Sequence, residues 1–427
     1  MTTILVIGFF SLILLSVPIS ISMGAAIIVA LLVSGWADTL YIVPTQILEG
    51  VDKPALVAVP FFILAGNLMN AVGMTDRIFA FASSLVGHFK AGLAQVNVLS
   101  SMIFAGVSGS SSADMAGLGA VEVKAMRDRG YPADYAAAIT LASGIIGPII
   151  PPSIALVVYS FLSGVSVGRL FLGGIVPGVL VGISLMVYNR IIADRRNFPR
   201  ERRATLAEVM HSARDGILAL VAPIIILSAI TTGFTTATEA GVLACVYSLV
   251  VGAVLGTLRR DKLWYAITST VIMTGVVMII VGFSIAMGWL LTIEGVPEQL
   301  THAFLSLTEQ RGVFLILVIG LLLMLGCVIE AVPLKLMLVP ILLPIVDQYG
   351  VDRVHFGLVL TLTVLMGHAT PPMGLGLYIL SSVAELPFER VVIAVAPLLI
   401  PLTVVLMLIT YIPELTLFLP NLIMGPP

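Results

Sequence analysis

The sequence predicts an all-α protein that crosses a membrane many times and contains two inverted repeats, each with a re-entrant hairpin and a broken helix. Three observations support this fold class. Of the 427 residues, 59% are hydrophobic and 10% are charged, with a mean hydropathy of +1.14, whereas soluble domains are about 45–50% apolar and about 25% charged. Glycines and prolines recur at one fixed spacing in the two halves of the chain, and the basic residues gather in a few short loops.

The long apolar stretches give the candidate spans, because a helix needs about 20 apolar residues to cross a bilayer. Residues 4–36 form either one long tilted span or two short spans around Pro18. Most of the other apolar stretches are too short for an ordinary crossing, or are interrupted by proline. The clear spans are, in order, 54–75, 170–189, 215–234, 239–257 and 265–292, and a final span covers 391–412.

Three short loops hold 13 of the 21 Lys and Arg residues, so the positive-inside rule places these loops in the cytoplasm. The opposite loops carry Arg169, Arg311 and Arg353. The net charge of −2 gives no indication of a nucleic-acid partner. The basic residues are Lys124, Arg127 and Arg129 in the first loop; Arg190, Arg195, Arg196, Arg200, Arg202, Arg203 and Arg214 in the second; and Arg259, Arg260 and Lys262 in the third.

A shift of 220 residues aligns two segments of the chain without a gap. From Gly130 to Gly350 the chain is expected to cross five times, at 133–163, 170–189, 215–234, 239–257 and 265–292. An odd number of crossings inverts the second copy relative to the bilayer. Inverted repeats with Gly- or Pro-interrupted spans in matching positions are the sequence pattern of secondary transporters. The aligned residues are Gly106 with Gly326, Gly130 with Gly350, Gly147 with Gly367, Pro151-Pro152 with Pro371-Pro372, and Pro177 with Pro397.

The first repeat contains a polar stretch, "GVSGSSSADMAGLG" at 106–119, between two short apolar arms within 92–126. We interpret this segment as a hairpin that enters from the cytoplasm and turns near Ser108–Asp114. Irregular backbone at membrane depth is tolerated where it lines a cavity or is buried in protein. Its free carbonyls, serine hydroxyls and helix N-terminus can hold an ion or an anion. The alternative is a polar loop outside the membrane between two thin spans.

The second hairpin, 312–347, enters from the opposite side, with the tip "GCVIEAVPLK" at 326–335. Glu330 aligns with Ser110, and an acid at this depth is costly unless it faces a cavity or a partner. The alternative is that Lys335 snorkels, or pairs with Glu330 and only orders the tip.

The double prolines should free backbone carbonyls around 147–150 and 367–370, because proline lacks an N–H and disrupts the preceding turn. Carbonyl and hydroxyl oxygens suit Na⁺, as in the unwound helices of transporters. Two hairpins and two breaks therefore predict two related cation sites. A plain proline kink that gives flexibility is the alternative.

Two amphipathic stretches, 74–89 and 296–307, occupy matching repeat positions and are read as helices on the membrane surface or as ordinary loop helices. In "GFTTATEAGVL" (233–243), Glu239 follows Thr238, and a helix N-cap is favoured over a binding role. Cys245 and Cys327 have no partners at metal or redox spacing and are expected to be packing residues.

Five motifs in the chain, "PFFILAGNLM", "SGSSSADMAG", "GPIIPPS", "GFTTATEA" and "GHATPPMG", resemble the large membrane subunit of tripartite ATP-independent periplasmic (TRAP) transporters. The resemblance covers essentially the whole chain, in family order. It implies an elevator-type carrier in the bacterial cytoplasmic membrane, related to the divalent anion:sodium symporters. Residues 92–190 and 312–427 would be the transport repeats, the latter with a C-terminal tail. Residues 1–91 and 191–311 would hold the scaffold helices and the two interfacial helices.

The resemblance also implies sodium-coupled import of an organic acid, sialic acid or a C4-dicarboxylate, without ATP. General resemblance favours the sialic-acid branch. The expected partners are a separate small four-helix membrane subunit and a periplasmic substrate-binding protein that delivers the carboxylate.

The same resemblance assigns two sodium sites and a substrate site to this sequence. The first sodium site would use Ser108, Ser111, Gly147, Ile150 and Pro152. The second would use Gly326, Glu330, Gly367, Thr370 and Met373. Substrate would lie near Ser110, Ser112, Asp114, Ser153 and Glu330.

Three other functions stay open at this point. One is a stand-alone divalent-anion/sodium symporter, and another is a channel. The third is an intramembrane enzyme that uses Asp114 and Glu330, but no GxSxG or HExxH motif accompanies these acids. No catalytic residue is therefore expected.

Overall fold

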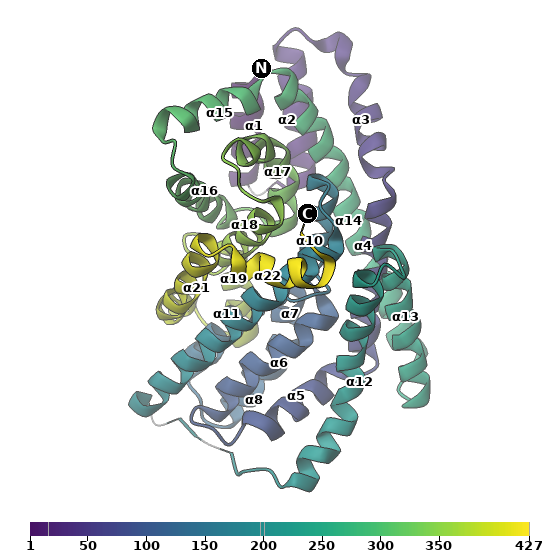
Figure 1. Cartoon of the computed structure of the whole chain (residues 1–427), viewed down its shortest axis with the longest axis vertical. Coiled ribbons are helices and arrows are strands. Elements are labelled where there is room, and N and C mark those ends of the chain that lie inside the picture. The colour runs from purple at the N-terminus through teal and green to yellow at the C-terminus, as the bar shows by residue number, and fades with distance from the viewer. Residues whose placement is uncertain (16, 197, 200, 427) are drawn as a thin grey trace.

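The computed structural model describes residues 1–15, 17–196, 198–199 and 201–426, without the side chains of Val107, Ser108, Ala113 and Arg196. All regular elements in these ranges are helices (Figure 1). Seven of them are long and apolar enough to cross a membrane, and shorter apolar helices fill the space between them. The composition therefore folds as an all-helical membrane body, as the sequence predicts.

Three of the first five helices, α2, α3 and α4, pack against the long helix α14 (Arg260–Ile293). The first predicted span is divided into two short helices, α1 and α2, which separate at Pro18 and pack on each other. Proline ends a helix readily because it lacks the N–H that the next turn needs. The helices are α1 (Thr2–Leu14), α2 (Ile19–Val33), α3 (Ile42–Val51), α4 (Ala58–Ala71) and α5 (Met74–Val86), with 3₁₀ turns η1 (Ala37–Thr39) and η2 (Pro54–Val57).

The first repeat begins with a hairpin of one long arm and one divided arm. A helix interrupted at the double proline follows, and a long helix closes the repeat. The elements are α6 (Gly92–Ser108), α7 (Ser111–Ala116), α8 (Leu118–Asp128), α9 (Ala133–Gly144), α10 (Ile154–Ser163) and α11 (Val167–Arg196).

Three long helices and one short helix connect the repeats. They are α12 (Leu206–Thr231), α13 (Ala237–Val254), α14 (Arg260–Ile293) and α15 (Val296–Leu307). The start of α13 has the predicted cap, but the N-cap residue is Thr236 and not Thr238. The Thr236 hydroxyl accepts from the Glu239 N–H at 3.3 Å, and Glu239 Oε2 accepts from the Thr236 N–H at 2.7 Å. This reciprocal pair is a capping box.

The second repeat has the same order of elements, and a short helix ends the chain. The elements are α16 (Arg311–Gly326), α17 (Ala331–Gln348), α18 (Arg353–Gly367), α19 (Leu375–Ala384), α20 (Phe388–Val395), η3 (Ala396–Leu398), α21 (Leu399–Tyr411) and α22 (Glu414–Met424). The long helix of the first repeat continues through Pro177, whereas its counterpart is divided into α20, η3 and α21 near Pro397.

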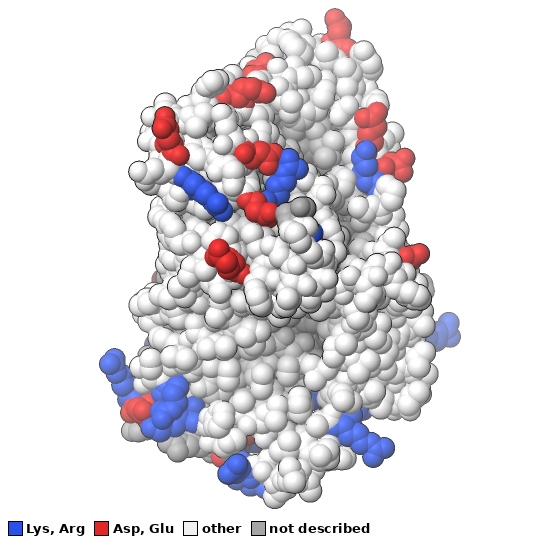
Figure 2. All heavy atoms as spheres, in the orientation of Figure 1, with Lys and Arg blue, Asp and Glu red and all other residues white. Residues whose placement is uncertain are grey.

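The structure confirms that the two repeats are equivalent and inverted. The breaks between α9 and α10 and between α18 and α19 both contain a cis proline pair, Pro151-Pro152 and Pro371-Pro372. The amphipathic helices α5 and α15 lie toward opposite ends of the long axis of the molecule (Figure 1). Basic side chains gather at the end near α5 and the α11–α12 connection, and acidic side chains dominate the other end (Figure 2). This charge distribution makes the α5 end cytoplasmic.

The α11–α12 connection holds the cytoplasmic end of the first hairpin. Glu201 accepts hydrogen bonds from Ser83 of α5 and from Arg129 beyond α8, both at 2.7 Å. The Tyr131 hydroxyl donates to the Pro199 carbonyl at 3.0 Å and accepts from the Leu93 N–H at 3.3 Å. Burial raises the pKa of Tyr131 to about 12, so this hydroxyl stays protonated and keeps its donor at neutral pH.

Candidate functional site

A cavity of about 190 Å³ lies where the two hairpin tips and the two broken helices meet α14. Both repeats contribute equivalent segments to it, and one face is formed by aliphatic side chains of α4 and α14. The lining residues are Gly109, Ser110, Ser111 and Ser112; Pro148, Ile154 and Ala155; Glu330, Ala331, Val332 and Pro333; Leu365 and His368; and Ile63, Ile272, Met273, Val276, Val277 and Ile280.

Two helices begin at this cavity. Helix α10 starts at Ile154 and helix α17 starts at Ala331, and both residues line the cavity. The first N–H groups of a helix lack intrahelical partners and carry partial positive charge. The N-terminal ends of α10 and α17 therefore favour an anionic group in the cavity.

The first hairpin tip lies directly on the first broken helix. Gly109 has a φ of +62°, and a Cβ placed on it would lie 2.7 Å from the Pro152 carbonyl oxygen. The Asp114 carboxylate lies against Gly147, so closely that a Cβ on that glycine would collide with it. Glycine is needed at position 109, where φ is positive and the obstructing atom is backbone. At position 147 it leaves room for the Asp114 carboxylate.

Ser111 has a hydroxyl with no hydrogen-bond partner among the described atoms, although its side chain is buried and lines the cavity. A buried hydroxyl without a partner is costly unless a ligand or water satisfies it. The structure thus brings the Ser111 tip to the Gly147–Pro152 break, which are the segments of the first predicted sodium site. The predicted ligand Ser108 has its side chain outside the described part of the chain.

The second hairpin tip approaches the second broken helix in the same way. A Cβ on Gly367 would lie 2.5 Å from the carbonyl carbon of Gly326. The Thr370 hydroxyl donates to the Met366 carbonyl at 2.8 Å, and the Gly367 carbonyl accepts from the Thr370 N–H at 3.0 Å. The side chain of Met373 is 41% exposed. Gly326 and Gly367 of the second predicted set are therefore adjacent in their backbones, and the Thr370 hydroxyl bonds locally to the end of α18.

The two hairpin tips touch each other. The Ser112 hydroxyl donates to Glu330 Oε1 at 3.4 Å, and the Ser110 and Ser112 hydroxyls lie 3.3 Å apart. Ser110, Ser112 and Glu330 all line the cavity. Three of the five residues predicted for substrate binding are thus brought together, from segments 218 residues apart.

Asp114 and Ser153 lie behind the lining residues. Asp114 is 5% exposed and faces Gly147. Ser153 is fully buried as the N-cap of α10, where its hydroxyl accepts from the Leu156 N–H at 3.2 Å and donates to the Pro148 carbonyl at 2.5 Å. Ser153 therefore holds the N-terminus of α10, which faces the cavity.

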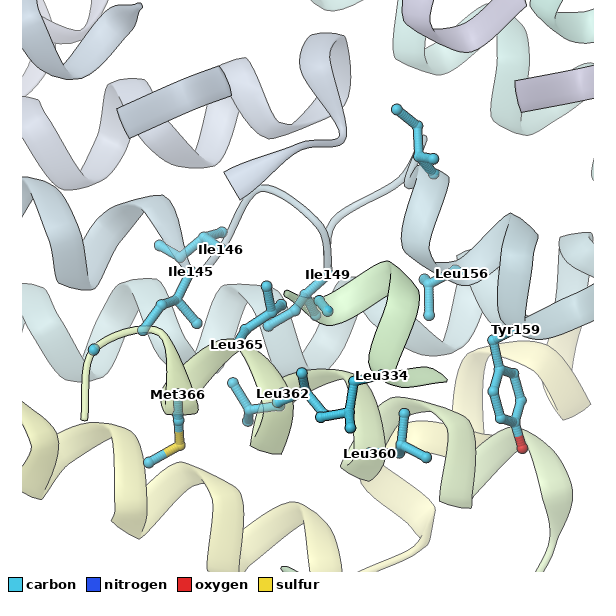
Figure 3. Close-up of a cluster of buried hydrophobic side chains, with 14 of the residues drawn as sticks. Ile145, Ile146, Ile149, Leu156, Tyr159, Leu334, Leu360, Leu362, Leu365 and Met366 are labelled. Carbon is cyan, nitrogen blue, oxygen red and sulfur yellow. The ribbon is translucent and has the colours of Figure 1, made fainter. Parts of the chain in front are cut away.

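An apolar cluster joins the two broken helices behind the cavity. Ile145, Ile146 and Ile149 of the first break lie beside residues of α18, with Leu365 and Met366 among them (Figure 3). The fully buried Tyr159 extends from α10 to the second repeat, where its hydroxyl donates to the Arg353 carbonyl at 2.7 Å. These contacts make the two repeats a single packed unit.

The alternatives for Lys335 are wrong. Its side chain is fully buried and does not snorkel, and the ion pairs of the described residues do not include it. Its ammonium donates to the Thr361 hydroxyl at 2.8 Å and to the Ala155 carbonyl at 3.3 Å. Sequence reasoning missed His368, which lines the cavity, although an ionisable residue in an apolar span is a signal of function.

Sequence reasoning also missed a buried polar cluster between the first hairpin and α9. Ser100 donates to Glu122 at 2.5 Å, while Asn97 donates to Thr140 and accepts from Ser143, both at 2.7 Å. These residues are spread over three apolar stretches, so no local motif marks them.

Two inverted repeats that meet at an internal cavity define a multi-pass membrane transport protein. Residues 6–415 match the model of the family described as "Tripartite ATP-independent periplasmic transporter, DctM component". The chain belongs to this family of bacterial cytoplasmic-membrane permeases, which are transporters and not enzymes.

Two relatives and one solved structure show what the chain is similar to. It is 43% identical to the sialic acid TRAP transporter large permease protein SiaM of Vibrio cholerae, over 89% of both chains. It is 36% identical to the sialic acid TRAP transporter permease protein SiaT of Haemophilus influenzae, over 96% of this chain but 66% of that longer protein. The crystal structure of the Alcanivorax borkumensis YdaH transporter shares the fold, with a TM-score of 0.64, 15% identity and 88% coverage of both chains.

Proposed function

We propose that the chain is the permease subunit that imports an organic acid with a sodium gradient, and that the acid is sialic acid. The observation that carries this proposal is the cavity shared by the two hairpin tips, where Ser112 contacts Glu330. Similarity to two permeases named for sialic acid supports the substrate class. A C4-dicarboxylate is the second candidate.

Sodium binding is supported by the oxygen-rich contacts between tips and breaks. The buried Ser111 hydroxyl lacks a partner among described atoms, and the Gly109 backbone lies close to the Pro152 carbonyl. Hydroxyl and carbonyl oxygens are the ligands that hard cations prefer. The first ion would lie among Ser111, Gly147, Ile150 and Pro152. The second would lie among Gly326, Glu330, Gly367, Thr370 and Met373.

An elevator movement is supported by the way the repeats pack. Contacts such as Tyr159 to Arg353 and Lys335 to Ala155 join residues 92–190 and 312–427 into one body. The wall opposite the tips consists of aliphatic side chains of α14, including Met273 and Val277. Apolar side chains form no directional bonds, so the tips can slide past this wall without breaking hydrogen bonds to it. Residues 1–91 and 191–311 would be the stationary scaffold.

The partners are a small membrane subunit and a periplasmic substrate-binding protein. Membership of a tripartite transporter family supports both. Exposed aliphatic residues on the scaffold helices, such as Ile224 and Val271, leave apolar surface for lipid and for a membrane partner.

The test is uptake into proteoliposomes that contain this chain, the small subunit and loaded binding protein. We expect uptake of sialic acid when an inward-directed sodium gradient is imposed, and no uptake when choline replaces sodium. Uptake driven by protons alone contradicts the sodium assignment. Uptake of free substrate by this chain alone favours the stand-alone symporter, and flux at channel rates favours a channel.

A further inference from the structure

The lining of the cavity includes no Lys or Arg among the described residues, although the proposed cargo is an anion. Its polar lining consists of three serines, Glu330 and His368. The basic groups next to the cavity are His368 in the wall and Lys335 directly behind it. These two residues have no role in the proposed sodium sites.

Lys335 is a buried lysine without a carboxylate partner in the described part of the molecule. Its hydrogen bonds go to Thr361 and to the carbonyl of Ala155, and Ala155 itself lines the cavity. Removing an ammonium from water is costly unless an opposite charge compensates for it. Ionisable residues at membrane depth commonly mark the path of a ligand, and Lys335 is such a residue.

His368 lines the cavity directly. Its side chain is 3% exposed, and its Nε2 is buried without a hydrogen-bond partner among the described atoms. Ala155 lines the same cavity, and Lys335 donates to its carbonyl, so one basic side chain lies in the wall and the other directly contacts a wall residue. The imidazole nitrogen is thus available to a ligand in the cavity.

Comparison of the repeats shows that the fold does not need this charge. Met115 stands at the position equivalent to Lys335, 220 residues earlier. Met115 packs against Gly376 of the other repeat's broken helix, 3.0 Å from where a Cβ would lie, and Lys335 contacts Ala155 of the first broken helix. Each of these two side chains extends from its own hairpin to the broken helix of the other repeat. Met115 shows that an unbranched apolar side chain is enough for this packing, so the amino group of Lys335 is not needed for the fold.

We propose that Lys335 and His368 form a basic wall that attracts one carboxylate of the substrate, and this inference rests on the proposed function. The other polar groups in the cavity are the serine hydroxyls and Glu330, which repels a second carboxylate. Ser110 and Ser112 suit hydroxyl or amide groups of the ligand. The substrate class is therefore a monocarboxylate that carries several hydroxyl groups, rather than a dicarboxylate.

The experiment compares acids with their uncharged derivatives. The chain is purified with its small subunit in nanodiscs with sodium, and dissociation constants are measured for N-acetylneuraminate, its methyl ester, gluconate, gluconamide and succinate. The wild type is expected to bind an acid at least tenfold more tightly than its neutral derivative. It is also expected to bind a hydroxylated monocarboxylate more tightly than succinate. Lys335→Met is expected to weaken acid binding at least tenfold and leave binding of the neutral derivative unchanged. His368→Leu is expected to act in the same direction by a smaller factor.

Met115→Leu is the matched control, because it alters packing at the equivalent crossing without changing charge. It is expected to leave the acid preference intact. Equal weakening of acid and neutral derivative by Lys335→Met overturns the proposal, because it indicates a packing role. Unchanged acid binding in that variant also overturns it, and so does a wild type without any acid preference.

The two proposals fail in distinguishable ways. If sialic acid is not taken up but gluconate is bound with the expected acid preference, the substrate of the proposed function is wrong and the basic wall stands. If sialic acid is taken up without any acid–ester difference, the basic wall is wrong and the transport function stands. Preference for succinate contradicts the single-carboxylate class.

Discussion

Single residues near the cavity divide into those that hold the fold and those that are free to bind. Ser111 and Ser153 are both buried serines beside the first break. The Ser153 hydroxyl has two partners within the protein, whereas that of Ser111 has none among described atoms. Loss of the hydroxyl should therefore reduce sodium affinity at Ser111 and reduce stability at Ser153.

Ser111→Ala should weaken sodium activation of uptake and leave the melting temperature unchanged. One hydroxyl contact contributes about 0.5–1.5 kcal/mol, which corresponds to roughly two- to tenfold in apparent sodium affinity. The measurement is uptake rate against sodium concentration in proteoliposomes. Wild-type sodium dependence in this variant contradicts a ligand role for Ser111.

Ser153→Ala should instead destabilise the protein, because α10 loses its N-cap. Loss of such a cap typically costs about 1 kcal/mol, and the Pro148 carbonyl also loses its donor. We expect a lower melting temperature in detergent and a normal sodium dependence of the remaining uptake. A variant as stable as the wild type, with altered sodium dependence, contradicts this assignment.

At the scale of elements, each hairpin touches its broken helix through glycine backbone. Gly367→Ala should separate α16 from α18, because the new methyl group meets the Gly326 backbone, which cannot move aside as a side chain does. Overpacking of this kind typically costs about 1–3 kcal/mol. We expect a lower melting temperature and loss of uptake.

Gly320→Ala provides the control on the same hairpin. Gly320 lies within α16, and a Cβ there meets nothing within 4 Å. Alanine is the better helix former, so this variant should be at least as stable as the wild type. Equal behaviour of the two variants contradicts the close approach of Gly326 and Gly367.

At the scale of the whole molecule, the inverted repeats require opposite ends of the structure to face opposite compartments. Single cysteines at Arg202 and Arg311, in a chain without Cys245 and Cys327, should be labelled from the cytoplasmic and the periplasmic side respectively. The native cysteines are buried, so their replacement should be tolerated. Labelling of both positions from one side of intact cells contradicts the inversion.

The sequence predicts most of the fold because its strongest signals are local. Apolar length, basic loops and the Gly/Pro pattern identify spans, orientation and repeat. A helix cap near Glu239 is predictable from the adjoining threonines, but the N-cap residue itself, Thr236, is identified only by the structure. The division of the first span into α1 and α2 is only half visible, because Pro18 permits both a kink and a break.

The site is predictable only in part because its contacts join distant residues. The hairpin tips are recognisable from their Gly and Ser content, and Ser112 does meet Glu330. The contact of Lys335 with Ala155, 180 residues apart, depends on how the repeats cross, and no local pattern specifies it. For the same reason, the sequence does not predict the burial of Glu122 beside Ser100.

The exchange of contacts between repeats has a consequence for biosynthesis. Helix α7 rests on α19, through Met115 and Gly376, and α10 rests on α17. The ribosome makes the first hairpin long before it makes Gly376, so that hairpin enters the bilayer with one flank uncovered. The first half of the nascent chain therefore waits in the membrane without its final support, and a functional cavity is completed only when the last quarter of the protein has been inserted.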